Sequence, residues 1–300
     1  MILMTSIKQL REECTDELFC AGNSTCAGCG LELAIRWAMK ALGPRTAMVA
    51  PASCLNVIVG LWPKTAPSYP FINMAFAAGA AAATGIRAAY DIKGKEDMNV
   101  VVFAGDGGTT DIGIQALSGA AERGSNIIYA CYDNEAYMNT GRQRSSSTPY
   151  GASTTTTPTG KRQHKKNVPL IMASHGIYVA TCSISDIPDL YDKFKKAASL
   201  PGCKYIQIMA PCPPGWRYDP SDTVRIADLV VKTGMWILYE IENGKLRLTG
   251  KSARLLDKDQ RLPVVEYLSE QGRFSKISEQ DIQELQTWVD KNWEDLKRWM

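Results

Sequence analysis

A continuous apolar strand that ends in a glycine-rich turn constrains the fold of this chain more than any other feature. Residues 99–104 are Asn-Val-Val-Val-Phe-Ala, and Gly-Asp-Gly-Gly follows at 105–108. A β-branched run without polar alternation is typical of a parallel strand that helices cover on both faces. Similar strand and helix signals alternate along the first two-thirds of the chain, which predicts an α/β domain whose parallel sheet is flanked by helices. The predicted strands are 46–50, 99–104, 126–132, 178–182 and 204–209, and the predicted helices are 31–42, 74–86, 112–123 and 186–199.

The remaining segments differ in character from this alternation. A polar loop rich in Ser, Thr and Gly occupies 140–167, and loops of that length often carry function. The Asn-Gly pair inside 240–246 predicts a hairpin turn, and apolar residues at helical spacing predict a helix over 279–300. We therefore divide the chain into an α/β domain, 1–218, and a C-terminal extension of hairpin and helices, 219–300, that makes subunit contacts.

Composition and charge exclude several classes of protein. The 34 basic and 31 acidic residues leave a net charge of +3, too balanced for a protein that grips nucleic acid through its phosphates. The longest apolar stretch, 74–86, is too short to cross a bilayer, so we expect no membrane span. The first eight residues lack a signal-peptide pattern, and the cysteine count of 9 is odd. Both observations favour a cytoplasmic protein, in which clustered cysteines usually serve metal or redox chemistry.

Four of the cysteines occupy positions where a metal site can form. Cys26 and Cys29 are a Cys-x-x-Cys pair just before a predicted helix, and Cys54 and Cys212 each follow a predicted strand. All four can therefore gather at one edge of the sheet. The pair alone is compatible with a redox dithiol, half a zinc site or half an iron–sulfur site. Four thiolates suit zinc and a [4Fe–4S] cluster equally by number, and their dispersal along the chain favours the cluster.

The other five cysteines stand outside the proposed ligand set. Cys131 and Cys182 lie inside apolar strands, which predicts small core residues. Cys14, Cys20 and Cys203 receive no assignment, and Cys20 is the one most able to replace a member of the proposed ligand set.

The glycine-rich turn and an asparagine after the next strand form a second candidate site. Gly105 and Gly107 let backbone N–H groups approach a pyrophosphate, and the start of the following helix favours negative charge. Asp106 and Asn134 supply oxygen ligands for Mg²⁺, with the Ala136 carbonyl as a third. Ligands at the carboxyl ends of neighbouring parallel strands lie where open α/β sheets bind them. The tripeptide alone also fits a tight turn that caps a helix, but the whole pattern matches the motif of thiamine-diphosphate enzymes.

Together the four-cysteine set and the glycine-rich turn with Asn134 resemble the β subunit of the 2-oxoacid:ferredoxin oxidoreductases, in particular the pyruvate:ferredoxin type. The resemblance covers roughly residues 20–245. It implies a thiamine-diphosphate-binding fold with a parallel sheet flanked by helices and a C-terminal helical extension. Its motifs are Cys-Ala-Gly-Cys-Gly at 26–30, Cys-Leu at 54–55, Gly-Asp-Gly-Gly-Thr-Thr-Asp-Ile-Gly at 105–113, Cys-Tyr-Asp-Asn-Glu-Ala-Tyr-Met-Asn-Thr-Gly at 131–141 and Ala-Pro-Cys-Pro at 210–213.

The resemblance implies roles for particular residues. Asn139 would be catalytic, close to the thiazolium and the substrate. The [4Fe–4S] ligands would be Cys26, Cys29, Cys54 and Cys212. The residues that would bind thiamine diphosphate and Mg²⁺ are Gly105, Asp106, Gly107, Gly108, Asn134, Ala136, Asn139 and Thr140, of which Asp106, Asn134 and Ala136 would hold the metal.

The resemblance also implies a reaction and partners. Enzymes of this family oxidatively decarboxylate a 2-oxoacid such as pyruvate, pass electrons to ferredoxin and transfer the acyl group to coenzyme A, with the cofactor carrying the chemistry. The sequence has no Cys-x-x-Cys-x-x-Cys run for ferredoxin-type clusters and no second α/β half for the aminopyrimidine. We therefore expect an α subunit, and γ or δ subunits with ferredoxin-type clusters, in a hetero-oligomer.

Two positions depart from the family pattern and leave the substrate open. Leu31 follows Cys29-Gly30, and Asn56 follows Leu55, where family members often have Glu. Neutral residues near the cofactor favour a more anionic substrate, so oxalate, oxidised without coenzyme A, is a second candidate. The four cysteines and the Gly-Asp-Gly turn are also compatible with a non-redox thiamine enzyme that holds structural zinc. They fit a non-catalytic four-cysteine metal-binding module as well.

Two smaller signals receive structural interpretations. The basic run 161–166 is expected to be a solvated face of the long loop, although contact with a partner subunit or with coenzyme A phosphates also fits. His164 and His175 lack metal-ligand or triad neighbours in the sequence, so we expect neither to be catalytic.

Overall fold

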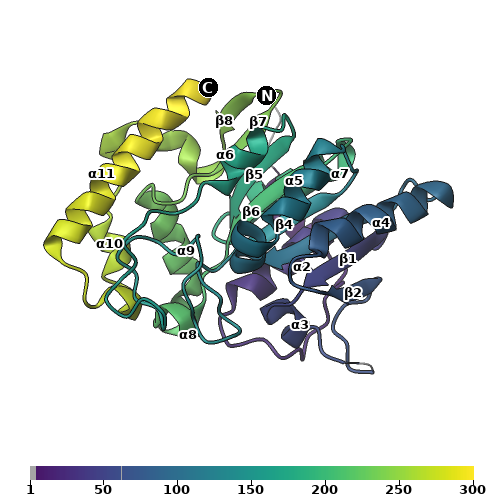
Figure 1. Cartoon of the computed structure of the whole chain (residues 1–300), viewed down its shortest axis with the longest axis horizontal. Coiled ribbons are helices and arrows are strands. Elements are labelled where there is room, and N and C mark those ends of the chain that lie inside the picture. The colour runs from purple at the N-terminus through teal and green to yellow at the C-terminus, as the bar shows by residue number, and fades with distance from the viewer. Residues whose placement is uncertain (1–4, 62) are drawn as a thin grey trace.

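The computed structural model describes residues 5–61 and 63–300. The first four residues of the N-terminal segment, for which we expect no signal peptide, lie outside the described residues. An eight-stranded sheet in the order β2-β1-β3-β4-β6-β5-β7-β8 forms its centre (Figure 1). The strands from β2 to β5 in this order are parallel, and β7 and β8 add an antiparallel hairpin at one edge. The strands are β1 (Thr46–Pro51), β2 (Phe71–Met74), β3 (Asn99–Gly105), β4 (Ile128–Asp133), β5 (Tyr178–Ser183), β6 (Lys204–Met209), β7 (Tyr239–Glu242) and β8 (Lys245–Leu248).

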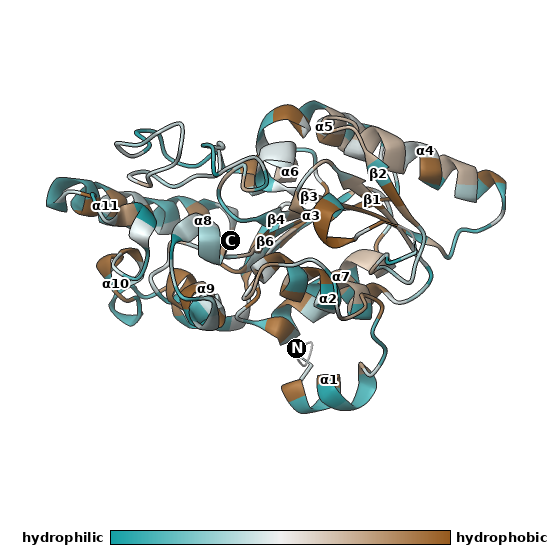
Figure 2. Cartoon of the chain, turned by 90° about the horizontal axis from the view of Figure 1, so that it is seen from below, coloured by the Kyte–Doolittle hydropathy of each residue, from teal (hydrophilic) through white to brown (hydrophobic). Residues whose placement is uncertain are grey.

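Helices cover both faces of this sheet (Figure 2). One apolar core joins the sheet to α4, α5, α6 and α11, and a second joins its other face to α1, α2 and α7. The predicted α/β class is confirmed. The helices are α1 (Ile7–Glu13), α2 (Gly30–Leu42), α3 (Cys54–Ile58), α4 (Gly79–Ile92), α5 (Ile114–Glu122), α6 (Val168–Ala173), α7 (Ile187–Ser199), α8 (Pro213–Trp216), α9 (Thr223–Lys232), α10 (Val265–Leu268) and α11 (Glu279–Leu296), with short turns η1 (Gly107–Ile112), η2 (Pro220–Asp222), η3 (Gly250–Arg254), η4 (Lys258–Gln260), η5 (Gly272–Phe274) and η6 (Lys297–Trp299).

The apolar run of β3 follows from burial on both faces. Val100, Val102 and Ala104 pack into the core beneath α4 and α5, whereas Val101 and Phe103 pack into the core beneath α2 and α7. No side chain of this segment needs to be polar, which explains the missing alternation. The carboxyl end of β3 and the glycine-rich turn that follows it therefore lie at the middle of the sheet edge.

The small-residue helix differs from its predicted bounds at both ends. It begins later than predicted because Met74 completes β2, the parallel edge strand that we did not predict. It also continues past Arg87, which is buried and therefore does not mark the end of the helix. The Arg87 guanidinium donates to the Met98 carbonyl at 2.6 Å and pairs with Asp91 at 2.6 Å. Its charge is satisfied within the fold.

Close backbone approach explains the small residues at the start of α4. A Cβ atom on Gly79 would lie 2.5 Å from Pro51 Cγ and 3.1 Å from Val102 Cγ1. The helix predicted at 112–123 likewise begins earlier than expected, because η1 forms one wide turn directly after Asp106 and runs into α5. The glycine-rich turn is thus the beginning of a helix.

The C-terminal segment adds to the same sheet. Asn243 and Gly244 have φ angles of 51° and 74° at the turn between β7 and β8, which confirms the hairpin. Since β7 pairs with β5, residues beyond 218 extend the sheet, and the division at 218 stays a prediction. α11 confirms the final helix, and its buried Trp293 donates to the Gly234 carbonyl at 3.0 Å. Within 5–61 and 63–300, no helix has the length and apolar character needed to span a bilayer.

Candidate functional site

A cavity of about 270 Å³ lies at the carboxyl ends of β1, β3 and β4. Gly105 ends β3, and Cys54 opens α3 directly beyond β1. The aromatic residues Phe76, Tyr132 and Tyr137 form part of its wall. The structure brings together in this lining all the residues predicted to bind thiamine diphosphate and Mg²⁺, namely Gly105, Asp106, Gly107, Gly108, Asn134, Ala136, Asn139 and Thr140.

Three oxygen atoms converge inside this cavity. The Asn134 amide oxygen lies 2.9 Å from Asp106 Oδ1 and 2.9 Å from the Ala136 carbonyl oxygen, so acceptors face acceptors. Turned over, the amide NH₂ group would donate to both oxygens. In the orientation present, a cation between the three oxygens satisfies them all. Adjacent ligands of octahedral Mg²⁺, with bonds of about 2.1 Å, lie about 3.0 Å apart. The spacing therefore fits Mg²⁺.

The electrostatics of Asp106 also call for a cation. Its side chain is completely buried, and burial is the main reason that its pKa lies well above the ordinary value. The neighbouring Asp133 carboxyl raises this pKa further. Ser145 Oγ donates to Asp106 Oδ2, which leaves Oδ1 directed at the converging oxygens. A buried carboxylate ionises readily only beside a positive charge, which a divalent ion supplies.

The glycines beside Asp106 keep one wall of the cavity open. A Cβ atom on Gly107 would lie 2.4 Å from Tyr137 Cε1, and one on Gly108 would lie 3.2 Å from Phe76 Cε2. Both glycines lie in the first turn of the η1–α5 helical segment, where backbone N–H groups lack helical partners and suit an anion. A diphosphate has the charge that such N–H groups attract.

Three of the four cysteines of the proposed ligand set lie at element ends, and the fourth, Cys26, lies in the loop before α2. Cys29 precedes α2, Cys54 opens α3 and lines the cavity, and Cys212 precedes α8. The Gly30 N–H donates to the Pro211 carbonyl at 3.1 Å, which joins the Cys-x-x-Cys loop to the turn that holds Cys212. Segments far apart in the sequence thus meet here.

The four thiols lie within electrostatic reach of one another. Burial is the largest cause that raises the pKa of Cys54 and of Cys212 to about 12, and the charges of Cys29 and Cys26 act in the same direction on both. Such thiols bind metal only when the metal displaces their protons. In the part of the chain that the structure describes, no three His, Cys, Asp or Glu side chains are close enough to hold a metal ion as they stand. The four-cysteine ligand set therefore stays a prediction.

The other cysteines lie apart from this group. Cys131 and Cys182 are fully buried in β4 and β5, which confirms them as core residues. Cys203 is buried as well, Cys14 is half-buried and Cys20 is exposed.

A buried network of charges lies behind the converging oxygens, and we did not predict it. Glu135 pairs with Lys165 Nζ and with Arg273 Nη2, each at 2.5 Å. Asp133 accepts a hydrogen bond from Gln207 Nε2 at 2.7 Å and lies 3.9 Å from Lys165 Nζ. Burial alone would raise the pKa of Glu135, but Lys165 and Arg273 outweigh burial and hold this pKa below its ordinary value. Glu135 is thus a permanent buried anion with two cationic partners.

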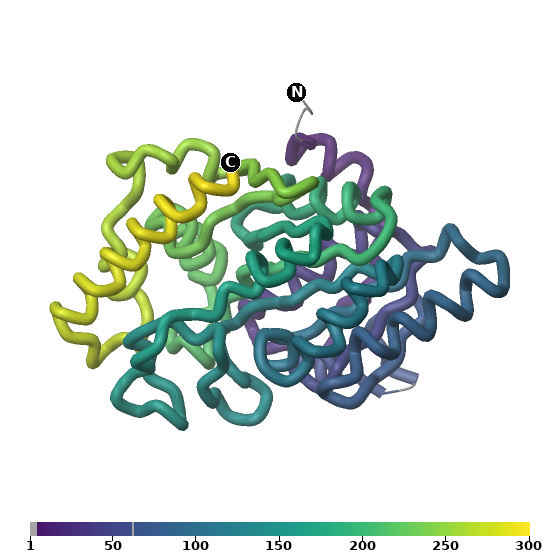
Figure 3. The backbone as a smooth tube through the Cα atoms, turned by 45° about the horizontal axis from the view of Figure 1, so that its top comes forward, coloured from purple at the N-terminus to yellow at the C-terminus, as the bar shows by residue number. Residues whose placement is uncertain are grey.

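The basic run 161–166 is not the solvated loop face that we expected. Lys161 is fully buried and donates to the carbonyls of Ser146 at 3.0 Å and Thr148 at 2.6 Å. His164 stacks on Trp288 of α11 with ring centroids 5.1 Å apart. Figure 3 shows this teal loop beside the yellow C-terminal helix. The basic residues therefore fasten the loop to the rest of the fold, and neither His164 nor His175 lines the cavity.

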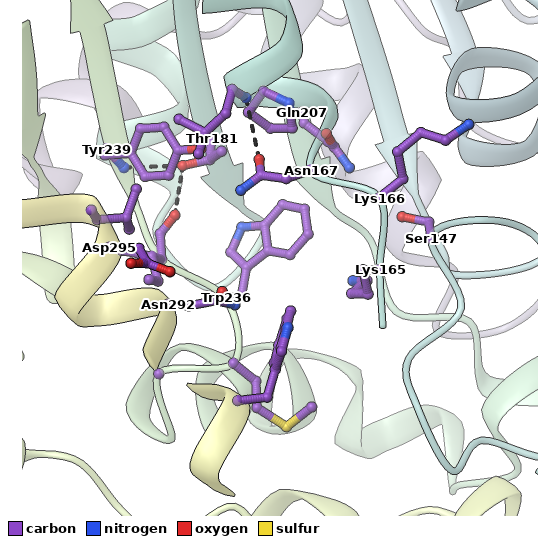
Figure 4. Close-up of a pocket in the computed structure, with 17 residues that line it drawn as sticks. Ser147, Lys165, Lys166, Asn167, Thr181, Gln207, Trp236, Tyr239, Asn292 and Asp295 are labelled. Carbon is purple, nitrogen blue, oxygen red and sulfur yellow. Dashed lines mark hydrogen bonds between the residues drawn. The ribbon is translucent and has the colours of Figure 1, made fainter. Parts of the chain in front are cut away.

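A second cavity, of about 200 Å³, borders the same network (Figure 4). Ser147, Lys165 and Gln207 line it, and all three also approach Asp133. Figure 4 shows the Trp236 indole in the middle of the lining residues. None of the residues predicted to bind thiamine diphosphate, Mg²⁺ or the cluster lines this second cavity.

Comparison with known proteins identifies the family. Residues 58–208 match the thiamine pyrophosphate enzyme C-terminal TPP binding domain. The chain is 51% identical to pyruvate synthase subunit PorB of Methanothermobacter thermautotrophicus, over 94% of this chain and 98% of that protein. It is 47% identical to ketoisovalerate oxidoreductase subunit VorB of Pyrococcus abyssi, over 94% of this chain and 93% of that protein.

A solved structure shares the fold. The 2-oxoglutarate:ferredoxin oxidoreductase from Magnetococcus marinus matches with a TM-score of 0.58 and 23% identity, over 72% of this chain and 80% of that chain. The resemblance inferred from the motifs is confirmed by relatives that align along nearly the whole chain. The chain belongs to the β subunits of the pyruvate- and ketoisovalerate-type 2-oxoacid:ferredoxin oxidoreductases.

Proposed function

We propose that the first cavity is the half of a thiamine-diphosphate site that binds Mg²⁺ and the diphosphate. The holoenzyme would oxidatively decarboxylate pyruvate, pass the electrons to ferredoxin and transfer the acyl group to coenzyme A. The observation that carries this proposal is that the Asp106 carboxylate, the Asn134 side-chain amide and the Ala136 carbonyl meet at one point of the cavity lining. Pyruvate is favoured because the pyruvate synthase subunit cited above is the more similar of the two relatives.

The residues of this chain would bind and orient the cofactor. Asp106, Asn134 and the Ala136 carbonyl would hold Mg²⁺, and the N–H groups of Gly107 and Gly108 would donate to the diphosphate. When bound, thiamine diphosphate supplies the carbon nucleophile and accepts the electron pair that departing CO₂ leaves behind. The aromatic residues Phe76, Tyr132 and Tyr137 would lower the polarity around the bound cofactor, which strengthens its polar contacts.

Asn139 has a different position from these residues. It lies in the cavity lining but is exposed, as is Thr140. An amide there can donate to the carbonyl oxygen of a bound 2-oxoacid, so we assign Asn139 to substrate orientation. Thr140 donates to Gln143 Oε1 at 2.6 Å, which supports the loop that carries Asn139.

The four cysteines would hold a [4Fe–4S] cluster that accepts electrons singly. The donor set fits, because four thiolates are the usual ligands of such a cluster. Cys54 belongs both to the cavity lining and to the ligand set, so the two cofactors would be neighbours. Zinc at the same four thiolates is the competing occupant, and it would leave the enzyme without a redox path.

The exposed side of the site suits a partner subunit. Val57, Leu61 and Ile72, on and near α3 and β2, are exposed apolar residues beside the cavity end of the sheet. Burying such residues between chains is favourable. An α subunit would cover them and hold the aminopyrimidine, and γ or δ subunits would carry ferredoxin-type clusters, all in the cytoplasm.

We favour pyruvate over a more anionic substrate such as oxalate, because the two departures from the family pattern lie outside the cavity lining. Asn56 does not line the cavity, because its Nδ2 donates to Asn73 Oδ1 at 2.6 Å on the neighbouring strand. Leu31 is buried in the core beneath α2. The two departures from the family pattern therefore do not change the lining that a substrate would meet.

The test is an anaerobic assay of the complex purified with its partner subunits. Pyruvate, 2-oxoisovalerate, 2-oxoglutarate and oxalate are compared with and without coenzyme A, with ferredoxin reduction followed by absorbance. We expect the fastest reduction with pyruvate and coenzyme A. Iron analysis and the loss of brown colour with dithionite test the cluster in the same sample, and a colourless protein containing zinc would contradict it.

A further inference from the structure

We propose that Arg273, stacked on Trp216, is a positioning residue for the metal-binding turn 134–136. The C-terminal segment, which lies outside the glycine and cysteine motifs, would then set the metal affinity of the cofactor site. This inference rests on the proposed function, because it assumes that Mg²⁺ binds between the three converging oxygens.

The turn holds an unusual backbone conformation. Glu135 lies between Asn134 and Ala136 with φ at 64°, and this left-handed bend directs the Asn134 side chain and the Ala136 carbonyl toward one point. Residues other than glycine seldom adopt this conformation, so the surroundings must hold it. Thr148 Oγ1 donates to the Glu135 carbonyl at 2.6 Å, and the Glu135 N–H donates to Asp133 Oδ1 at 3.0 Å.

Arg273 and Trp216 contact two successive residues of this turn. The Arg273 guanidinium pairs with the Glu135 carboxylate at 2.5 Å and lies 3.7 Å from the centre of the Trp216 ring. Trp216 Nε1–H donates to the Asn134 carbonyl at 2.8 Å. The stacked pair therefore fixes the side chain of Glu135 and the main chain of Asn134 at the same time.

The guanidinium is itself held in place. Arg273 is buried, its Nε–H donates to Gln271 Oε1 at 2.8 Å, and its Nη2 donates to Tyr267 OH at 2.9 Å. The Ser153 N–H donates to the Arg273 carbonyl at 2.9 Å. The planar guanidinium reaches Gln271, Tyr267 and the Glu135 carboxylate at the same time, which the compact ammonium of a lysine would not do. The arrangement is a rigid support for the ligand turn.

The experiment measures metal affinity in the purified complex. Arg273→Gln removes the cation, and Trp216→Phe keeps an aromatic ring for stacking but removes the donor to Asn134. The matched control is Arg247→Gln on β8, because Arg247 also pairs with a buried carboxylate at 2.6 Å, but that carboxylate, Glu240, lies on β7 and not in the turn 134–136. Mn²⁺ is titrated at saturating thiamine diphosphate and followed by its electron paramagnetic resonance signal, and Mg²⁺ is titrated by thermal stabilisation.

We expect both variants to raise the dissociation constant for the metal by roughly 10–100-fold, the usual effect of losing a residue that orients a ligand. The control should keep the wild-type constant. At saturating Mg²⁺ each variant should regain kcat, which a generally destabilised protein would not do.

A wild-type metal constant in Arg273→Gln would overturn the proposal. If that variant does not assemble, Trp216→Phe decides, and a wild-type constant there overturns it equally. A wild-type complex that binds thiamine diphosphate without any divalent ion would instead refute the proposed function.

Discussion

Replacing Gly107 by Ala should weaken stability and thiamine diphosphate binding together. The added methyl group would lie 2.4 Å from Tyr137 Cε1 and 2.8 Å from Tyr137 Cζ. Carbon atoms in contact are about 3.5–4.0 Å apart, so the ring has to move by about 1 Å or more. Tyr137 lines the cavity, and its OH donates to Asp111 Oδ2 at 2.9 Å. Moving the ring therefore breaks this hydrogen bond and narrows the space for the diphosphate.

The magnitude follows from two contributions. Overpacking costs about 1–3 kcal/mol, and the lost hydrogen bond costs about 0.5–1.5 kcal/mol. Together they lower the free energy of unfolding by about 1.5–4.5 kcal/mol. For a chain of 300 residues, with an unfolding entropy of about 2.1 cal/mol/K per residue, this lowers the midpoint of thermal unfolding by about 2–7 °C.

Gly119→Ala is the matched control, in the helix that continues from the same turn. A Cβ atom there would meet only the flexible end of Arg123, with Nη1 at 3.0 Å, so alanine should stabilise the helix by about 0.5–1 kcal/mol. The assay is thermal unfolding of the purified complex by circular dichroism, with and without Mg²⁺ and thiamine diphosphate. Gly107→Ala should lower the midpoint and lose the cofactor-induced rise, and Gly119→Ala should do neither. Equal behaviour of the two variants would refute the reasoning.

Three further predictions address the metal, the cluster and the pH dependence of stability. Asp106→Asn removes a buried carboxylate whose pKa is raised by burial, so the cofactor-free complex should unfold at a higher temperature. The stabilisation that Mg²⁺ and thiamine diphosphate give the wild-type complex should disappear in this variant. Retained stabilisation in thermal scans would contradict the prediction. Cys54→Ser should lower the iron content of the anaerobic complex, whereas Cys20→Ser, at an exposed thiol, should not, and equal iron in both would remove Cys54 from the ligand set. Burial lowers the pKa of Lys204 from 10.5 to about 8. Between pH 8 and pH 10.5 the unfolded chain therefore binds more protons at this residue than the folded chain does. The contribution of Lys204 to the free energy of unfolding rises with pH over this range, by on the order of 3 kcal/mol. Lys204→Met should flatten the rise in urea unfolding free energy from pH 8 to 10, and an unchanged slope would argue against it.

The parts of the site that could be predicted are carried by short segments at strand ends. Gly105 to Gly108 and Asn134 follow two strands that are neighbours in the sheet, and parallel strands bring their carboxyl ends to one edge. Local sequence is sufficient there, because the strand signal and the ligand are adjacent. The same reasoning places Cys54 and Cys212 near this edge, although it says nothing about their distances.

The parts that could not be predicted depend on contacts between distant segments. Lys165 lies in a polar loop and looks solvated in the sequence, yet it meets Glu135 inside the fold. Arg273 comes from the C-terminal segment, whose short helices carry no motif. Arg87 looks like the end of an apolar helix, but carbonyl groups beyond that helix satisfy its charge. In each case the partner of a charged residue becomes visible only once the chain has folded.

The most direct test of the central claim is the position of a divalent ion in a crystal of the complex soaked with Mn²⁺ and thiamine diphosphate, located by anomalous scattering. The account predicts an ion within about 2.2 Å of Asp106 Oδ1, the Asn134 amide oxygen and the Ala136 carbonyl oxygen, where these three atoms already converge. An ion elsewhere, with the Asn134 amide turned so that its NH₂ group donates to both neighbours, would contradict it.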